Sequence, residues 1–342
     1  MANVRVTTFH DLTRHVLDYL GATPTSEDNL RFARRAVLGA YMDVTTSRRW
    51  SYYYQHGRFT TVSHQTTGTI AYTASTRAVT LSGATWPSWA GAGVIQIANV
   101  PYDVASRDSG TQLTLATALS PDANIAAGTT YVLWQDTFTL PADFVATDEM
   151  IHLNNFLPLT YQHPTKWLVL HRIVRGPATP RLFTIMADPK YFGLFCARVY
   201  PPPDNVYVFD YIYQRRPRQL TLENYNTGTV SITSGSTSLA GSGTTWTSSM
   251  VGSVLRVSSS SEEPTGPAEE NPASVERTIT GFTGTGSMTL DGDPGLTLSG
   301  KKYTISDVID IEEGSMSNFM LRACERQARM VKRLKSTADE ER

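Results

Sequence analysis

The chain has 342 residues, 40% of them apolar, and its 30 basic and 31 acidic side chains leave a net charge of -1. This length and composition predict a globular protein of two or three domains with a full hydrophobic core. The charge balance argues against a protein that binds nucleic acid or an anionic membrane over its whole surface.

Two further features bear on where the protein works. Cys196 and Cys324 are the only cysteines, and they are too far apart in sequence for a disulfide framework or a metal-ligand spacing. No run of 18 apolar residues occurs, and residues 1–16 lack the layout of a secretory signal. We therefore expect a soluble protein with no membrane partner, assembled in the cytoplasm.

Residues 1–50 predict a helical hairpin. Between Phe9 and Leu20 apolar side chains recur every three or four positions, and Thr8, with an acid three residues later, can cap this helix. A second stripe with the same spacing follows Ser26, another possible cap.

The pattern changes to strands after the hairpin. From Trp50 to Tyr54 aromatic side chains alternate, which predicts that a strand begins there. Residues 63–136 are rich in Thr, Ser, Gly and Ala and contain short alternating runs, broken by turn residues at intervals of about 8–12 positions. This pattern is typical of a small all-β sandwich or barrel.

The central region, residues 137–222, has mixed character. Residues 164–176 predict a short helix. Three alternating segments predict strands, at 182–187, 192–200 and 206–216. The prolines between the last two segments cannot donate ladder hydrogen bonds, so they mark a break between strands.

Residues 223–305 repeat the first β segment. TGTIAYTASTRAVTLSGATW at 67–86 aligns without a gap with TGTVSITSGSTSLAGSGTTW at 227–246. The similarity continues later in both segments, so it covers a whole module. The repeat predicts two copies of one all-β module, at 63–136 and 223–305.

Residues 315–335 predict a terminal amphipathic helix. Phe319 or Met320 begins an apolar stripe that continues through Met330. The polar side carries a basic series with Glu325 as the only acid inside it: Arg322, Arg326, Arg329, Lys332, Arg333 and Lys335. This series is either a solvated face or an anchor that docks on a partner.

Together these elements predict an α+β fold. A discontinuous helical core with a small antiparallel sheet would be assembled from residues 1–62, 137–222 and 306–342. The two all-β modules would be insertions in loops of this core, where exposed loop tips tolerate inserted domains.

The sequence contains none of the common catalytic motifs, so we predict no catalytic, cofactor-binding or metal-binding residues and no enzyme. GFTGTG at 281–286 is similar to a phosphate loop but precedes a strand-like segment, which favours a turn. Asp291 and Asp293 lack the other ligands of a calcium loop. His152, His163 and His171 form the only loose cluster of histidines.

Trp86 and Trp246 occupy equivalent positions in the two modules. Each indole could fill the centre of its own module, which we favour because small β modules contain few large side chains. Alternatively, each could stack on a sugar at the surface.

Several of these features together resemble the head-to-tail adaptor (connector, tail accessory or neck) proteins of tailed bacteriophages. The similarity rests on the helical hairpin ending in RRW, LPADF after the first module, VYPPPDNVYVFDYIYQRRP, the TGTVSITSGSTSLAGSGTTW module and the basic terminal helix. It touches most of the chain, and each piece alone is only moderately specific.

The resemblance implies a structural virion protein at the neck, which forms a homo-oligomeric ring, commonly of twelve copies, below the portal. The ring joins the capsid to tail or nozzle proteins and extends the channel for genome ejection, so that DNA passes without specific binding. Residues 316–342 would be the portal-docking arm, with Phe319 and Met330 beside the basic series.

Two other classes of function stay open from the sequence. The chain could be a tail or surface protein that binds a glycan through the paired modules, with Trp86 and Trp246 as platforms. It could also be an enzyme with a site in the central region, near the loose histidine cluster.

Overall fold

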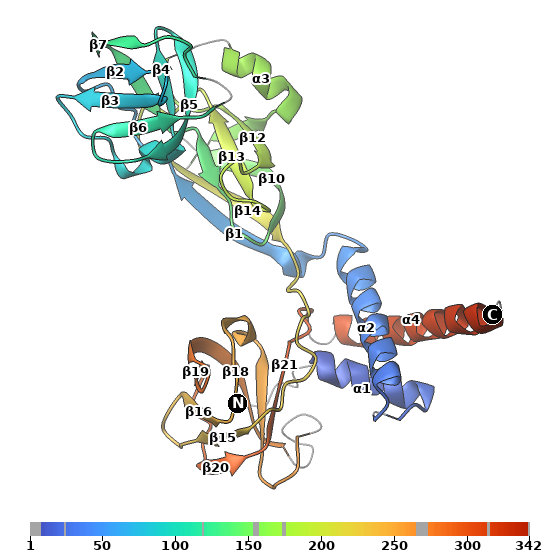
Figure 1. Ribbon diagram of the computed structural model, residues 1–342. Helices are drawn as coiled ribbons and strands as arrows, with labels where there is room; N and C mark the ends of the chain where they lie inside the picture. Colours follow the sequence, from blue (N-terminus) through green and yellow to red (C-terminus); the bar gives the residue numbers. More distant parts are fainter. Residues whose placement is uncertain are drawn as a thin grey trace. The chain divides into compact units, whose positions relative to one another are not determined.

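The computed structural model describes residues 8–23, 25–117, 120–152, 157–172, 176–264, 273–312 and 315–340 (Figure 1). Strands account for 40% of the structure and helices for 22%, and the strands form three curled sheets of seven strands each. The expected α+β fold, a helical core with a small antiparallel sheet, is therefore wrong. The protein is mostly β.

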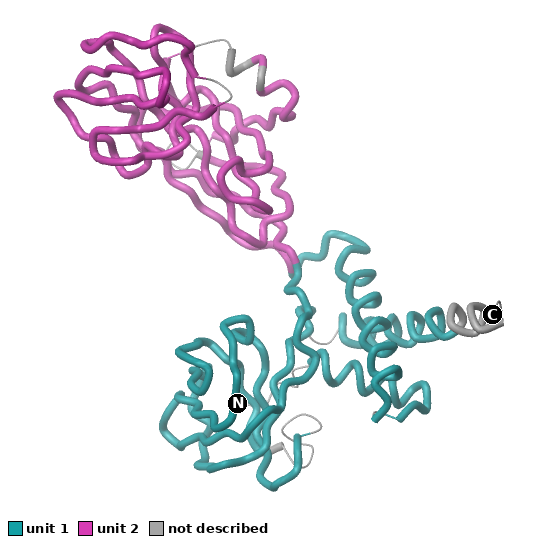
Figure 2. The backbone as a smooth tube through the Cα atoms, viewed as in Figure 1, with its two compact units in different colours: residues 1–52, 217–342 teal, residues 53–216 magenta. Residues whose placement is uncertain are grey.

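The chain divides into two compact units (Figure 2). Unit 1 contains residues 1–52 and 217–342, and unit 2 contains residues 53–216. The segments that we expected to form one core are shared between these units. The physical reason is that the helices and the central sheet have separate apolar clusters, and the helical cluster takes in Leu220 and Ile309 from the chain that flanks the second module.

Unit 1 begins with helices α1 (Phe9–Leu20) and α2 (Glu27–Thr46). The predicted cap of α1 is confirmed: Asp11 N–H donates to the Thr8 hydroxyl, and Thr8 N–H donates to the Asp11 carboxylate at 2.9 Å. Gly21 ends α1 in the left-handed region with φ 61°. Ser26 is the N-cap residue of α2, but its side chain makes no capping hydrogen bond.

Helix α4 (Ser315–Glu340) completes the helical cluster of unit 1. Its buried stripe follows a spacing of four residues: Met316, Met320, Cys324 and Ala328. Of the two residues that could begin the stripe, Met320 is therefore the core residue and Phe319 points outward.

The second β module belongs to unit 1. Its sheet has the order β20-β15-β16-β19-β18-β17-β21, and a short 3-10 helix, η3 (Ser248–Met250), follows Trp246. Its strands are β15 (Thr229–Ile232), β16 (Ser238–Ser242), β17 (Val254–Ser258), β18 (Ala273–Gly284), β19 (Ser287–Leu290), β20 (Leu298–Lys301) and β21 (Tyr303–Ser306).

The first β module, in unit 2, has the same topology, with the order β7-β2-β3-β6-β5-β4-β8 and η2 (Ser88–Ala92) after Trp86. Its strands are β2 (Thr69–Thr73), β3 (Ala78–Ser82), β4 (Val94–Ile97), β5 (Val100–Arg107), β6 (Gln112–Leu115), β7 (Ile125–Thr129) and β8 (Tyr131–Trp134). Gly68 and its equivalent Gly228 share a positive φ, 90° and 85°. The repeat in the sequence thus corresponds to one β topology built twice.

The central sheet of unit 2 has the order β1-β14-β10-β11-β12-β13-β9. Its strands are β1 (Tyr54–Thr60), β9 (Thr137–Thr139), β10 (Phe144–His152), β11 (Leu157–Tyr161), β12 (Leu182–Ala187), β13 (Phe195–Tyr200) and β14 (Val208–Arg215). Helix α3 (Pro164–Arg172) lies between β11 and β12 in the chain, and these two strands pair in parallel. The three predicted strands are confirmed as β12, β13 and β14. The strand expected from Trp50 starts only at Tyr54, after the short helix η1 (Ser51–Tyr53).

Gly57 on β1 makes room for the ring of Tyr211 on β14. The two residues are directly paired, and a Cβ atom at position 57 would lie 2.4 Å from Tyr211 Cζ. Tyr211 is buried in the core of the central sheet, so it cannot simply swing away.

We therefore expect Gly57→Ala to lower the free energy of unfolding by about 1–3 kcal/mol through overpacking. Denaturant unfolding followed by circular dichroism measures this. Thr60→Ala, at the far end of β1, is the control. A Gly57→Ala variant as stable as the control would show that the ring is not held against this strand.

Candidate docking surface

Helix α4 carries most of the predicted docking residues on the side opposite its buried stripe. Phe319 is 53% exposed and Met330 is 47% exposed. Phe319, Arg322, Arg326 and Met330 are spaced by three or four residues, which places them along one side of the helix. Arg322 and Lys332 are also exposed. The side chains of Arg333 and Lys335 lie outside the described residues.

Two of the predicted docking cations also contact neighbouring helices. The Arg326 guanidinium lies 3.5 Å from the Asp43 carboxylate of α2, which also accepts a hydrogen bond from Gln327 at 2.5 Å. Arg329 donates to the Tyr19 hydroxyl of α1 at 2.5 Å. These pairs are exposed, so each adds little stability, but together they fix the direction of the cationic side chains. We call Phe319, Arg322, Arg326, Arg329, Met330 and Lys332 the α4 surface.

A polar network holds the helices of unit 1 against the second β module. Arg256 on β17 donates to both carboxylate oxygens of Asp11 on α1, at 2.7 and 2.8 Å, and to Glu276 on β18 at 2.7 Å. The Arg256 side chain is almost fully buried, so its charge requires both carboxylates. Asp11, which also accepts the Thr8 N–H in the cap of α1, thus has a second role that its position in the sequence does not reveal.

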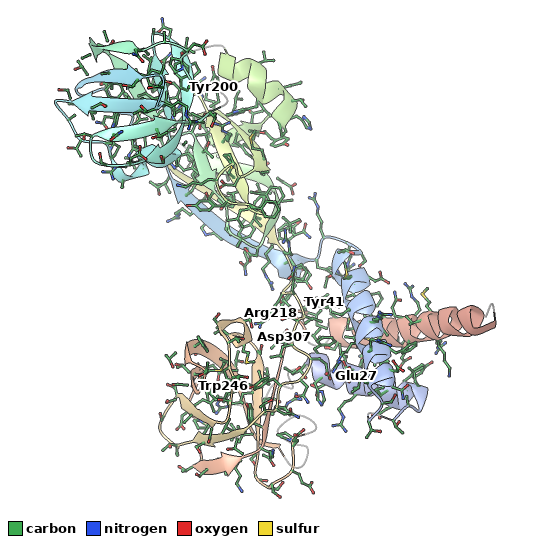
Figure 3. The ribbon with its side chains drawn as sticks, viewed as in Figure 1. Glu27, Tyr41, Tyr200, Arg218, Trp246 and Asp307 are labelled. Carbon is green, nitrogen blue, oxygen red and sulfur yellow. The ribbon has the colours of Figure 1, made fainter. Side chains whose placement is uncertain are left out.

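Asp307 forms a second junction in unit 1 (Figure 3). Its carboxylate accepts hydrogen bonds from the Ser253 hydroxyl at 2.8 Å and from Arg218 at 3.0 Å. It also accepts from the backbone N–H groups of Thr221 and Leu222, both at 2.7 Å. The side chain is 1% exposed. The buried Asp307 carboxylate therefore connects three segments of unit 1. These are the chain at residues 218–222, Ser253 directly before β17, and the end of the module at Asp307 itself.

A polar cavity of about 330 Å³ lies beside these junctions, within unit 1. Glu223 in its wall contacts His10 at 2.8 Å and Arg34 at 2.9 Å. Burial alone would raise the pKa of Glu223, but the hydrogen bonds and charges of His10 and Arg34 outweigh it and lower this pKa below its ordinary value. The Glu223 carboxylate in the cavity wall is thus compensated by His10 and Arg34.

Both repeated tryptophans are buried, each 1% exposed. Trp246 Nε1 donates to the Tyr303 hydroxyl at 3.0 Å, and this hydroxyl donates to the Thr227 carbonyl at 2.6 Å. Trp86 packs edge-on against the equivalent Tyr131, with ring centroids 5.1 Å apart. A sugar stacks on an exposed ring face, and neither indole presents one.

The other motifs have structural roles. GFTGTG spans the turn between β18 and β19, and the Asp293 carboxylate caps the backbone N–H groups of Gly235 and Gly295 at 2.8 Å. Burial raises the pKa of the Cys196 and Cys324 thiols to about 12, so neither thiol is reactive at neutral pH. The side chains of His152 and His171 lie outside the described residues.

Within the described ranges, no group of three or more His, Cys, Asp or Glu side chains could hold a metal ion. Across the same ranges, none of the helices combines the length and the apolar character that a membrane span requires.

We compared the chain with family models, with curated proteins and with solved structures, and none of the three comparisons returned a match. The function is therefore argued from the residues and their arrangement.

Proposed function

We propose that this chain is a structural virion protein of a tailed bacteriophage. In this proposal it forms a homo-oligomeric ring below the portal, joins the capsid to the tail and extends the DNA channel. The α4 surface docks on the portal. No catalytic step belongs to this function.

The observation that carries the proposal is the two-sided character of α4. One side is a continuous part of the core, whereas the other presents Phe319, Met330 and four cations to solvent. Aromatic, Met and Arg side chains are enriched at protein interfaces, whereas a purely solvated helix face has no need of exposed Phe and Met. Because α4 packs against α1 and α2 in one apolar cluster, it is already ordered before docking, which lowers the entropic cost of binding.

The charge of the chain agrees with a channel protein. DNA must slide through the ring, and each cation that contacts a phosphate adds salt-dependent affinity. With a net charge of -1, the chain has no overall attraction for DNA. No observation favours the glycan-binding alternative, because both tryptophans are buried.

The test is electron microscopy of the purified full chain mixed with the portal protein of the same virus. We expect a ring that caps the portal with matching symmetry. A chain that leaves the portal bare at all concentrations would contradict the proposal.

Point variants locate the contact better than truncation. Removing residues 316–342 would also remove four buried core residues of α4 and so unfold the helical part. In Phe319→Asp with Arg322→Glu, both positions are exposed, so we expect a normal fold and at least about tenfold weaker portal binding. Arg35→Glu, an exposed charge reversal on α2, is the matched control. Equal binding by the control and the double variant would remove α4 from the interface.

A further inference from the structure

The hairpin that joins β12 to β13 in unit 2 has a fixed tip. Asp188 is buried, and its Oδ1 accepts the backbone N–H groups of Lys190 at 2.8 Å and Tyr191 at 3.1 Å. Its Oδ2 accepts the Thr139 hydroxyl at 2.7 Å. Gly193 closes the turn with φ 81°, in the region that favours glycine. These bonds hold the tip in one shape.

The tip presents apolar side chains to solvent. Phe192 is 106% exposed, so its ring is fully open to solvent, and Tyr191 beside it is 47% exposed. Lys190 is exposed, and its ammonium lies 5.6 Å from the centroid of the Tyr191 ring. A locked turn that displays a Phe ring loses little conformational entropy when the ring is buried by a partner. We call Lys190, Tyr191 and Phe192 the knob.

An apolar pocket lies elsewhere on unit 2, on the outer face of β1, β14 and β10. Its volume is about 480 Å³, and its apolar lining includes Tyr54, Ile151 and Ile212, all partly exposed. The register places these residues on the face opposite the core, because their neighbours Phe209, Tyr211 and Tyr213 point inward. A pocket of this size can hold an aromatic side chain.

The rim of this pocket is acidic. Asp148 and Glu149 line it and are exposed. Asp210, also in the lining, is paired with Arg58 at 2.5 Å and lies 3.2 Å from His56, so its charge is already compensated. The positive Lys190 of the knob is therefore complementary to the exposed carboxylate of Glu149 at this rim.

We propose that the knob of one copy of this chain docks in the pocket of a second copy. Phe192 enters between Ile151 and Ile212, and Lys190 faces Glu149. The knob follows β12, whereas the pocket lies on β1, β14 and β10, so the contact joins two different patches. Such a heterologous contact leaves each copy with one free knob and one free pocket, and repetition closes a ring.

This inference rests on the proposed ring and names the contact that builds it. The test compares the assembly of full-length variants by sedimentation velocity. Phe192→Asp removes the knob, Ile212→Asp blocks the pocket, and Val206→Asp changes an exposed apolar residue outside both patches. We expect the first two to weaken self-association at least about thirtyfold, as for a central interface residue, and the control to assemble as the wild type does.

Mixing the two variants tests the direction of the contact. Phe192→Asp keeps its pocket and Ile212→Asp keeps its knob, so an equimolar mixture at high concentration should form 1:1 dimers and nothing larger. Each variant alone should stay monomeric. Dimers in either single sample would overturn the heterologous arrangement.

A charge exchange provides evidence that does not depend on the apolar variants. Lys190→Glu and Glu149→Lys should each weaken assembly, most strongly at low salt, and the double variant should recover it. The outcomes separate the two proposals. A wild-type chain that never assembles would contradict the ring itself. A wild-type ring that persists in both apolar variants, or no recovery in the double variant, would overturn the knob and pocket alone.

Discussion

Replacing Trp246 by alanine should lower the free energy of unfolding of the second β module by about 3–5 kcal/mol, as expected for a large buried side chain. Trp246 is 1% exposed and lies in the apolar cluster of this module, edge-on to Tyr303 with ring centroids 6.1 Å apart. The truncation leaves a cavity and removes the donor to the Tyr303 hydroxyl. Denaturant unfolding followed by circular dichroism gives the difference.

Trp246→Phe is the matched control for this variant. It keeps one aromatic ring in the cavity and loses the second ring of the indole with its N–H group, so the void is smaller than in the alanine variant and the loss of stability should be clearly smaller. Within the described residues the Trp86 indole N–H has no hydrogen-bond partner, so Trp86→Phe should cost less than Trp246→Phe. Unfolding of Trp246→Ala at nearly the wild-type midpoint would show that the indole does not fill the module.

Replacing Asp307 by alanine should destabilise unit 1 by about 3–5 kcal/mol, because it removes at once the acceptor of two backbone N–H groups, of the Ser253 hydroxyl and of the partly buried Arg218. The carboxylate of Asp307 binds Arg218, Ser253 and the backbone of residues 221–222. In the variant these groups lose Asp307 as their acceptor, and Arg218 keeps its hydrogen bond to Ser253 Oγ at 3.1 Å. Thermal unfolding of the purified variant, compared with the wild type at one protein concentration, measures the loss.

Two substitutions serve as controls for Asp307→Ala, and both should lower the free energy of unfolding by less. Asp307→Asn keeps the shape of the side chain and one acceptor oxygen, so its stability should lie between those of the wild type and the alanine variant. Asp28→Ala removes an exposed carboxylate that pairs with the exposed Arg31 at 2.5 Å, and such surface pairs contribute about 0–1 kcal/mol. If Asp307→Ala were as mild as Asp28→Ala, the junction would not hold unit 1 together.

The helices could be predicted because their caps and apolar spacing lie within one segment of the chain. The repeat could be predicted because its two segments align without a gap. The cap at Thr8 and the spacing of apolar residues after it determine α1, and the gapless alignment of 67–86 with 227–246 reveals the two equivalent sheets. The phase of α4 was ambiguous, because Phe319 and Met320 are adjacent apolar residues and only packing against α2 decides between them.

The central sheet could not be predicted from the sequence, because its pairings are not local. β1 pairs with β14 across about 150 residues, and β10 has two register shifts that break the alternation of its side chains. Charged residues on the outward face of this sheet also make its strands harder to recognise in the sequence. We therefore expected a small sheet inside a helical core, where the structure has seven strands.

The polar junctions were also hidden in the sequence. Arg256 lies in the middle of β17 and Asp307 directly follows β21, and nothing in the sequence around them distinguishes these charged residues from surface residues. The sequence pattern predicts a strand from Phe192, whereas β13 begins at Phe195 and Phe192 lies at the exposed tip of the turn before it. Burial and exposure of these side chains depend on contacts between distant segments, which only the fold provides.

The most direct test of the central claim is the mass of the assembled protein. Native mass spectrometry of the purified full chain should show one dominant closed oligomer whose mass is an integral multiple of 37.7 kDa, and with its portal protein an assembly whose mass is that of the portal plus such a multiple. A chain that remains a 37.7 kDa monomer in both samples would contradict the account.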